Sequence, residues 1–199
     1  KFEGNAPSRT YFDPHIILHI TSAKLGGKKE PILRNTDDLY AWYASLVEEI
    51  NPAGEAELKA IVDEVVKGKT TQRQKAEAIF KWVQDNVNYI AFEDGMGGFI
   101  PRNAIDVCTK KYGDCKDMAN LVTQMLRLGG LESYMTWIGT RSKPYTYKKV
   151  PTPIVDNHMI STLILDGDTL FLDATGKYQT IDLPTDMIQG KEALIGIDK

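Results

Sequence analysis

Several residue types and patterns are scarce in this 199-residue sequence, and each scarcity excludes a class of protein. There are two cysteines, Cys108 and Cys115, and no CxxC pair, so neither a disulfide framework nor a cysteine-based zinc site is expected. No apolar run approaches the roughly 18 residues of a membrane-spanning helix, so we expect no transmembrane segment in this chain. The net charge is −3, which argues against nucleic-acid binding because that function leaves a basic footprint.

Patterns for metals, phosphates and cofactors are also missing. Residues 95–101 are rich in glycine but match neither a P-loop nor a GxGxxG motif. His15 and His19 lie four residues apart without a third ligand in sight, which does not predict a metal site. No acidic loop of the EF-hand type implies calcium. We therefore expect no metal and no cofactor.

The elements that are present predict an α+β protein, with helices first and an antiparallel sheet afterwards. Apolar residues recur at helical spacing through the first two thirds of the chain, and short apolar runs separated by turns follow. The predicted helices cover residues 37–50, 55–67, 72–87, 103–111 and 115–128. The predicted strands cover residues 134–139, 157–165, 169–173 and 193–197.

The first 30 residues differ from this pattern. Residues 14–20 alternate in a way that predicts a strand, and residues 26–31 have the composition of a linker. We interpret residues 1–30 as the tail of an upstream β-domain with its linker, and residues 31–199 as a core domain.

Cys115 stands where a turn runs directly into a helix. Gly113 gives backbone freedom for the turn, and Asp114 is a common turn or cap residue. Unpaired amides and the positive end of the helix dipole surround the first helical turn, and both favour a thiolate, which is the nucleophilic form. The alternative is that Cys115 is a small buried hydrophobic residue, as most lone cysteines are.

Two further side chains lie at matching places on a predicted hairpin. His158 begins one strand, and Asp173 ends the strand that returns after the turn at residues 166–168. This turn pairs residue 158 with residue 175 or 176, so His158 and Asp173 become neighbours across the ladder. A histidine held in one tautomer by a carboxylate is a general base for a nearby thiol. Each residue alone is more often structural, but the order Cys, His, Asp is more specific.

Four segments together resemble the transglutaminase-like (papain-like thiol) superfamily, and within it the bacterial transglutaminase-core proteins. They are residues 82–89 (WVQDNVNY), residues 112–117 (YGDCKD) with the following helix, Asn157 with His158, and residues 172–175 (LDAT). Among them, the GDCKD string is the most specific. The resemblance implies a papain-like fold in which the nucleophile helix packs on an antiparallel sheet. It also implies a β-rich domain upstream and a periplasmic or extracellular location.

The resemblance further implies that Cys115 is the nucleophile, His158 the general base and then acid, and Asp173 the orienting carboxylate. The expected reaction is acyl transfer on a peptide or protein amide, as in a protease, a deamidase or a transglutaminase. Two alternatives stay open: a catalytically silent peptide-binding module with the same fold, and a redox or structural pair of Cys108 with Cys115. Cys108 does not belong to the family pattern, and we interpret it as structural.

Overall fold

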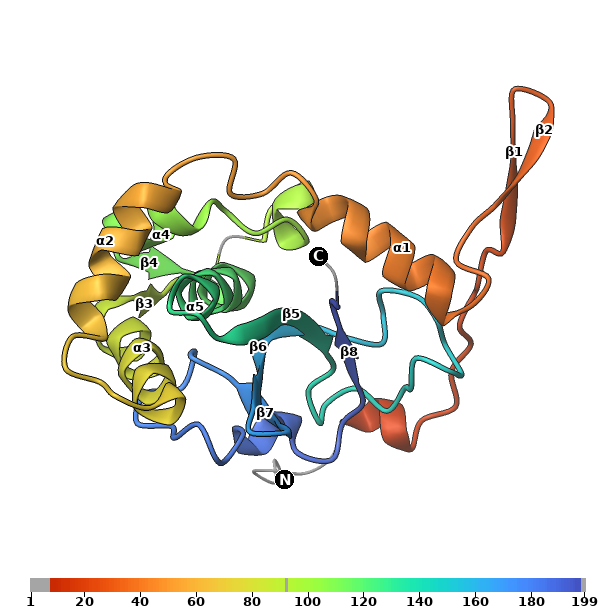
Figure 1. Ribbon diagram of the computed structural model, residues 1–199. Coiled ribbons are helices and arrows are strands. Elements are labelled where there is room, and N and C mark those ends of the chain that lie inside the picture. Colours follow the sequence, from red (N-terminus) through yellow and green to blue (C-terminus); the bar gives the residue numbers. More distant parts are fainter. Residues whose placement is uncertain (1–7, 92, 198–199) are drawn as a thin grey trace.

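The computed structural model describes residues 8–91 and 93–197, and it consists of a layer of helices, a central helix and an antiparallel sheet (Figure 1). Helices α2, α3 and α4 form the outer layer, and α5 lies between them and the sheet. The helices span Thr36–Val47 (α1), Glu55–Val65 (α2), Gln72–Asn86 (α3), Ala104–Lys110 (α4) and Cys115–Leu128 (α5). Short 3-10 turns occupy Arg9–Tyr11 (η1), Gly95–Gly98 (η2) and Asp186–Ile188 (η3). This is the predicted α+β, papain-like arrangement.

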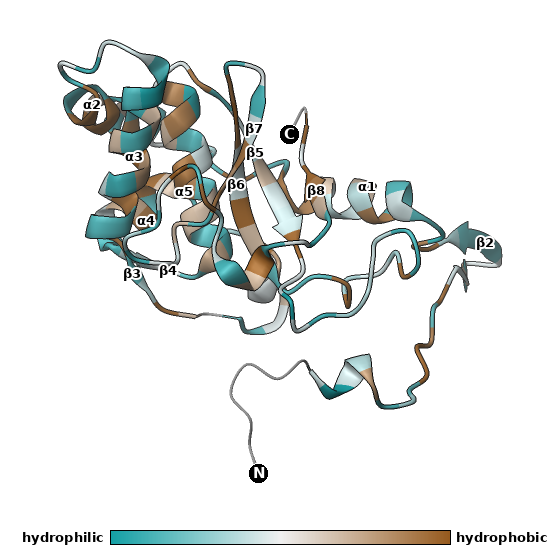
Figure 2. Ribbon diagram, turned by 90° about the horizontal axis from the view of Figure 1, so that it is seen from below, coloured by the Kyte–Doolittle hydropathy of each residue, from teal (hydrophilic) through white to brown (hydrophobic). Residues whose placement is uncertain are grey.

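Among the described helices, the central helix α5 is the most buried because both of its faces are covered. Most of its residues are buried, including Met118, Leu121, Val122, Met125 and Leu126. These side chains pack with apolar residues of α2, α3 and α4 on one side and of the sheet on the other. Figure 2 shows hydrophobic residues on the inward faces of α3 and α5 and hydrophilic residues outside. Burying this apolar surface fixes α5, and with it the position of Cys115, relative to the sheet.

The main sheet has four antiparallel strands in the order β7-β6-β5-β8. They span Glu132–Ile138 (β5), His158–Leu165 (β6), Asp168–Leu172 (β7) and Ala193–Ile195 (β8). Strands β6 and β7 form the predicted hairpin, and Asp166 and Gly167 both have positive φ in its two-residue turn. The pairing of Ser161 with Leu172 extrapolates to residue 158 opposite residue 175, as the sequence predicted.

A second buried cluster joins α1 to the far end of the sheet. Leu39, Tyr43 and Val47 of α1 pack with Met135, Trp137 and other apolar residues. Asn35 is the N-cap and accepts a hydrogen bond from the Asp38 amide, whereas the Thr36 hydroxyl donates to the Tyr147 carbonyl at 3.2 Å.

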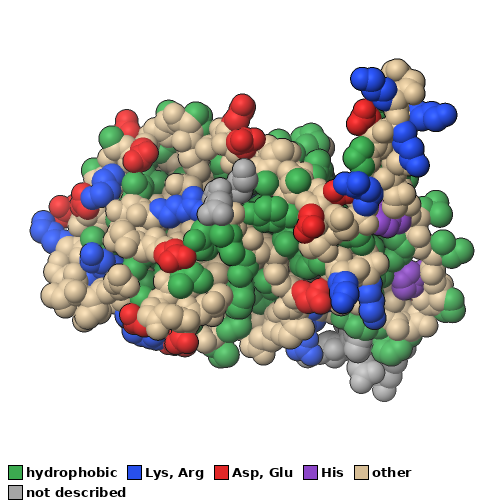
Figure 3. All heavy atoms as spheres, turned by 45° about the vertical axis from the view of Figure 1, so that its right-hand side comes forward, with side chains coloured by type: hydrophobic (Ala, Val, Ile, Leu, Met, Phe, Trp, Pro, Cys, Tyr) green, Lys and Arg blue, Asp and Glu red, His purple; other side chains and the backbone are tan. Residues whose placement is uncertain are grey.

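The N-terminal segment corrects two predictions. Residues 14–20 were predicted to be a strand but are extended without strand pairing, because no neighbouring strand lies beside them among the described residues. The predicted linker at residues 26–31 instead belongs to a hairpin of Ser22–Leu25 (β1) and Lys28–Pro31 (β2), whose turn is Gly26-Gly27 with positive φ at both glycines. Figure 3 shows Lys and Arg side chains gathered on this projecting hairpin.

Candidate active site

Cys115 is the first residue of α5, and a short parallel pairing sets its approach. Asn88–Tyr89 (β3) pairs with Tyr112–Gly113 (β4), which leads directly into the helix. Asp114 is the N-cap and forms a reciprocal capping box with Asp117. A side chain at position 113 would put its Cβ 2.7 Å from the Asp117 Cβ, so glycine is needed there for close approach. The predicted turn and cap are thus confirmed, and the Cys115 side chain is partly exposed.

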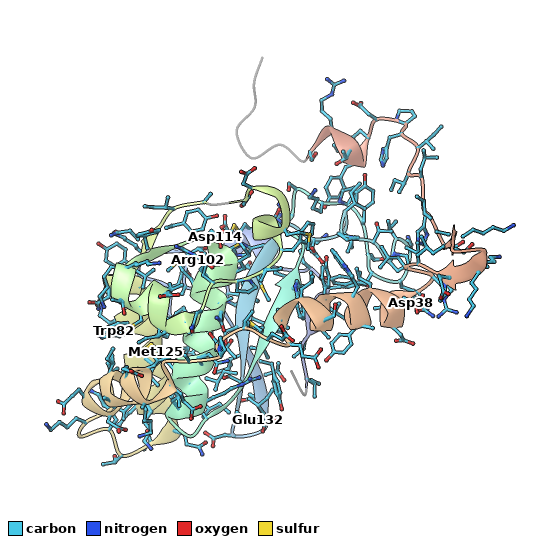
Figure 4. All side chains as sticks on the ribbon, turned by 90° about the horizontal axis from the view of Figure 1, so that it is seen from above. Asp38, Trp82, Arg102, Asp114, Met125 and Glu132 are labelled. Carbon is cyan, nitrogen blue, oxygen red and sulfur yellow. The ribbon has the colours of Figure 1, made fainter. Side chains whose placement is uncertain are left out.

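Two ion pairs hold the backbone around Cys115. The buried Lys116 ammonium contacts the buried Asp114 carboxylate. Arg102 donates to Asp117 from its backbone N–H at 2.8 Å and from its guanidinium at 2.7 Å. Burial raises the pKa of Asp117, but the Arg102 hydrogen bonds outweigh burial and hold that pKa below its usual range. Figure 4 shows Arg102 and Asp114 together at the end where α5 begins, with Met125 further along the helix.

His158 and Asp173 meet across the hairpin as the sequence predicted. The His158 Nε2 lies 2.9 Å from Asp173 Oδ2, and both side chains are buried. The same carboxylate accepts hydrogen bonds from the Thr185 hydroxyl at 2.7 Å and from the Thr175 hydroxyl at 2.6 Å. Thr185 was not predicted, because it lies in an irregular segment with no periodic signal. These bonds orient Asp173, and Asp173 in turn orients the imidazole ring.

The surrounding charges and hydrogen bonds favour the protonated form of His158 and the ionised form of Asp173. Burial lowers the pKa of His158, but hydrogen bonds with Asp173 and with the Cys115 side chain, and the charges of both, raise it to about 9. Burial likewise raises the pKa of Asp173, and the hydrogen bonds from His158, Thr175 and Thr185 bring it below its usual range. Since Nε2 is used by Asp173, Nδ1 is the ring nitrogen that remains for Cys115. The three predicted residues are therefore brought together.

A cavity of about 320 Å³ opens beside Cys115 and His158. Its remaining wall combines three aromatic and two acidic residues with glycines and other side chains. The lining residues are Tyr43, Glu93, Gly95, Gly98, Phe99, Lys116, Trp137, Pro153, Asp156, Asn157 and Met159. The Tyr43 and Trp137 rings are stacked 4.9 Å apart, which makes one side of the cavity a rigid apolar surface.

Asp156 is a second residue of this site, after Thr185, that the sequence did not reveal. Its carboxylate accepts hydrogen bonds from the Tyr43 hydroxyl at 2.8 and 2.9 Å and from the Tyr147 hydroxyl at 3.1 Å. Burial raises the pKa of Asp156 to about 6, although both tyrosines and Lys143 favour its charged form. Residues 141–156 carry no periodic pattern, and Tyr43 is far away in the chain, so nothing local predicted this group.

Comparison with known families places the chain. The model of the transglutaminase-like superfamily matches residues 59–168, more than half of the sequence and a span that includes Cys115 and His158. The chain belongs to the transglutaminase-like superfamily. The resemblance drawn from the GDCKD string is confirmed. No curated protein sequence matches the chain significantly.

The chain is also similar to several solved structures. A proposed protease from Parabacteroides distasonis superposes with a TM-score of 0.57 at 14% identity, over 75% of this chain and 31% of that one. A proposed cysteine protease from Cytophaga hutchinsonii has a TM-score of 0.46 at 22% identity, over 61% and 37% of the two chains. LapG from Legionella pneumophila gives 0.41 at 12% identity, over 74% and 76%. This transglutaminase-like chain spans about a third of the length of the first two structures.

Within residues 8–91 and 93–197, no group of three or more His, Cys, Asp or Glu side chains is arranged to hold a metal ion. None of the helices described is both long and apolar enough to cross a membrane. Cys108 and Cys115 are both free thiols, and Cys108 is buried in the main core.

Proposed function

We propose that this protein is a thiol acyl-transfer enzyme that acts on peptide or protein amide bonds. Cys115 is the nucleophile, His158 the general base and acid, and Asp173 the orienting carboxylate. The observation that carries the proposal is the buried His158–Asp173 hydrogen bond of 2.9 Å, with the other side of the ring in contact with Cys115 at the edge of a cavity. Membership of the transglutaminase-like superfamily, and a structure of like fold named as a proposed protease, support the same chemistry.

Each step of the mechanism uses a group already in place. The Cys115 thiolate attacks the amide carbonyl, and the resulting oxyanion is held in part by the Cys115 backbone N–H, which has no acceptor within the helix. The amide C–N bond then breaks as the His158 imidazolium donates its proton to the departing amine, leaving a thioester. Water or a second amine attacks the thioester, His158 takes the proton from it, and the C–S bond breaks. Water gives hydrolysis or deamidation, and an amine gives transamidation.

Alkylation by iodoacetamide tests the proposal directly. Near neutral pH, we expect Cys115 to be labelled at least 10-fold faster than a free cysteine, because His158 lies beside it as a general base. In His158→Ala the rate should fall to that of a free thiol or below it. A screen of peptide amides, with and without added alkylamine, then distinguishes hydrolysis from transamidation.

The controls separate the two alternative functions. Cys115→Ala, which retains the buried Cys108, should not be labelled under the same conditions. A silent peptide-binding module would show labelling no faster than a free thiol and no change in His158→Ala. A redox pair would show a mass gain of two hydrogens when the purified protein is reduced. Either result would contradict the acyl-transfer proposal.

We also propose that residues 1–30 belong to an upstream β-domain and residues 31–199 to the catalytic core. The support is the exposed apolar face of the segment at residues 14–20. Ile16, Leu18 and Ile20 are 88%, 89% and 65% exposed, which is unusual for residues of their type. Limited proteolysis of a longer chain should cut near the β1–β2 hairpin and release a core that retains the Cys115 reactivity.

A further inference from the structure

Asp156 is a partly buried carboxylate that forms no ion pair with the residues that the structure describes. Its hydrogen bonds come from two neutral hydroxyl groups, those of Tyr43 and Tyr147. Among the ion pairs of residues 8–91 and 93–197 none includes Asp156, and Lys143 acts on it only through longer-range attraction. Buried carboxylates are normally paired with a cation, because hydroxyl donors alone do not offset the loss of hydration. This carboxylate is therefore suited to receive a positive charge from outside the chain.

The surroundings of Asp156 fit a cation on an aliphatic stem. Asp156 lines the same cavity of about 320 Å³ as Cys115, and Glu93 contributes a second carboxylate to that cavity. The stacked rings of Tyr43 and Trp137 form part of its wall. Aromatic faces bind methylene groups through apolar contact and attract ammonium or guanidinium groups through their electron-rich surfaces. Among the described residues that line the cavity, Lys116 is the one cation, and it is already paired with the buried Asp114.

We infer that this cavity is a subsite for a lysine or arginine side chain of the peptide substrate, with Asp156 as the residue that selects its positive charge. The inference rests on the proposed function, because it places the side chain beside an amide attacked by Cys115. Asp156 is two residues before His158, so their Cα atoms lie at most about 7 Å apart. A lysine or arginine side chain spans such a distance from its own backbone.

An amine that attacks the thioester is a less suitable occupant of the same subsite. Such an amine must reach the thioester carbonyl and lose a proton to His158 before it can attack. A carboxylate several ångströms from His158 would stabilise the protonated ammonium form away from that carbonyl. The carboxylate therefore matches a group that stays charged throughout the reaction, as a guanidinium does.

Binding to Cys115→Ala tests the inference without turnover. Fluorescent hexapeptide amides carry either arginine or citrulline, its neutral isostere, at each position in turn, and their Kd values are measured by anisotropy. At one position, we expect arginine to bind at least about 10-fold more tightly than citrulline. Adding Asp156→Asn should reduce this ratio to less than about threefold, while the citrulline peptide keeps its affinity. A ratio near one at every position, or a ratio unchanged by Asp156→Asn, would overturn the inference.

Two controls separate charge from structure. Tyr147→Phe removes one hydroxyl partner but leaves the Asp156 charge, so the arginine preference should persist. Asp94→Asn removes a carboxylate that does not line the cavity, and it should change the Kd of neither the arginine nor the citrulline peptide. If a free alkyl diamine competes with the peptides only when Asp156 is present, and no peptide distinguishes arginine from citrulline, the subsite belongs to an amine and the inference is wrong.

This assay and the alkylation assay fail independently. An unreactive Cys115 would contradict the proposed function, yet the binding preference would still be measured in a variant that lacks the thiol. Rapid labelling of Cys115 without any arginine preference would leave the acyl-transfer proposal intact and reject the subsite.

Discussion

Two regions beside the cavity are built from different interactions. At the start of α5, next to Cys115, buried and half-buried charges have partners of opposite sign, Lys116 with Asp114 and Arg102 with Asp117. Asp156 lines the cavity, and among the described residues it accepts hydrogen bonds from the Tyr43 and Tyr147 hydroxyls but forms no ion pair. The paired charges fix the position of Cys115 at little cost in net charge. The Asp156 carboxylate instead leaves a local negative field, which is the property on which the proposed recognition of a substrate cation depends.

The largest expected effect comes from a substitution of Asp173, which orients His158. Asp173→Asn keeps the size of the side chain but removes the charge that orients His158 Nε2. We expect kcat for amide cleavage to fall by about 10³-fold, because the ring loses its preferred tautomer and its stabilised imidazolium. Asp168→Asn, at the turn of the same hairpin, should leave kcat unchanged. Similar kcat values for Asp173→Asn and the unsubstituted protein would rule out the proposed role of Asp173.

A second substitution tests the ion pair of Arg102 with Asp117 next to Cys115. Arg102→Met leaves the buried Asp117 carboxylate without its cation, so the free energy of unfolding in urea should fall by about 3 kcal/mol. The exposed pair of Arg73 with Asp182 provides the matched control, and Arg73→Met should leave the stability nearly unchanged because solvent screens that pair. Equal effects of the two substitutions would show that the Arg102 pair does not hold the start of α5.

The start of α5 and the contact of His158 with Asp173 could be predicted from the sequence, because their signals are local. Helical spacing after Cys115 predicted α5, and Asp114 was recognised as a turn or cap residue. The turn at residues 166–168 fixed the register that joins His158 to Asp173. In each case, the residues concerned lie within one element or one hairpin.

The contacts of Asp156 and Thr185 could not be predicted, because they join distant parts of the chain. Tyr43 and Asp156 are 113 residues apart, and residues 141–156 lack any period that would place them. Thr185 reaches Asp173 from another irregular segment. The β1–β2 hairpin, by contrast, had a local signal in Gly26-Gly27, which was interpreted as a linker. A glycine pair between polar residues fits both structures, and without alternating apolar residues the hairpin is not distinguished.

A smaller effect, confined to one ring, concerns the titration of His158. Its pKa is raised from 6.5 to about 9 in the folded protein, so its contribution to stability is fully present below pH 6.5 and is lost as the pH rises through about 9. The ring proton signal in an NMR titration should therefore move with a midpoint near pH 9. In Asp173→Asn the midpoint should shift toward the ordinary range, because the hydrogen bond with the Asp173 carboxylate contributes most to raising the pKa of His158. A midpoint near 6.5 in the unsubstituted protein would contradict the charged pair.

The smallest expected effect separates the contribution of the hydrogen bonds to Asp156 from that of its charge. Tyr147→Phe removes one of the two hydroxyls that bind Asp156, and the free energy of unfolding should fall by about 1.5 kcal/mol, because the lost bond is to a charged acceptor. In the background of Asp156→Asn the same substitution should cost less, giving a coupling energy of about 0.5–1 kcal/mol in a double-mutant cycle. Tyr145→Phe, on the same loop but hydrogen-bonded to His15 instead, should show no coupling with Asp156→Asn. A coupling energy near zero for Tyr147 would mean that its hydroxyl does not stabilise the carboxylate. Of the two tyrosine hydroxyls, that of Tyr43 alone would then stabilise the charge of Asp156. The surroundings of Asp156 and the ion-paired start of α5 would then differ less in how they hold a charge than their contacts indicate.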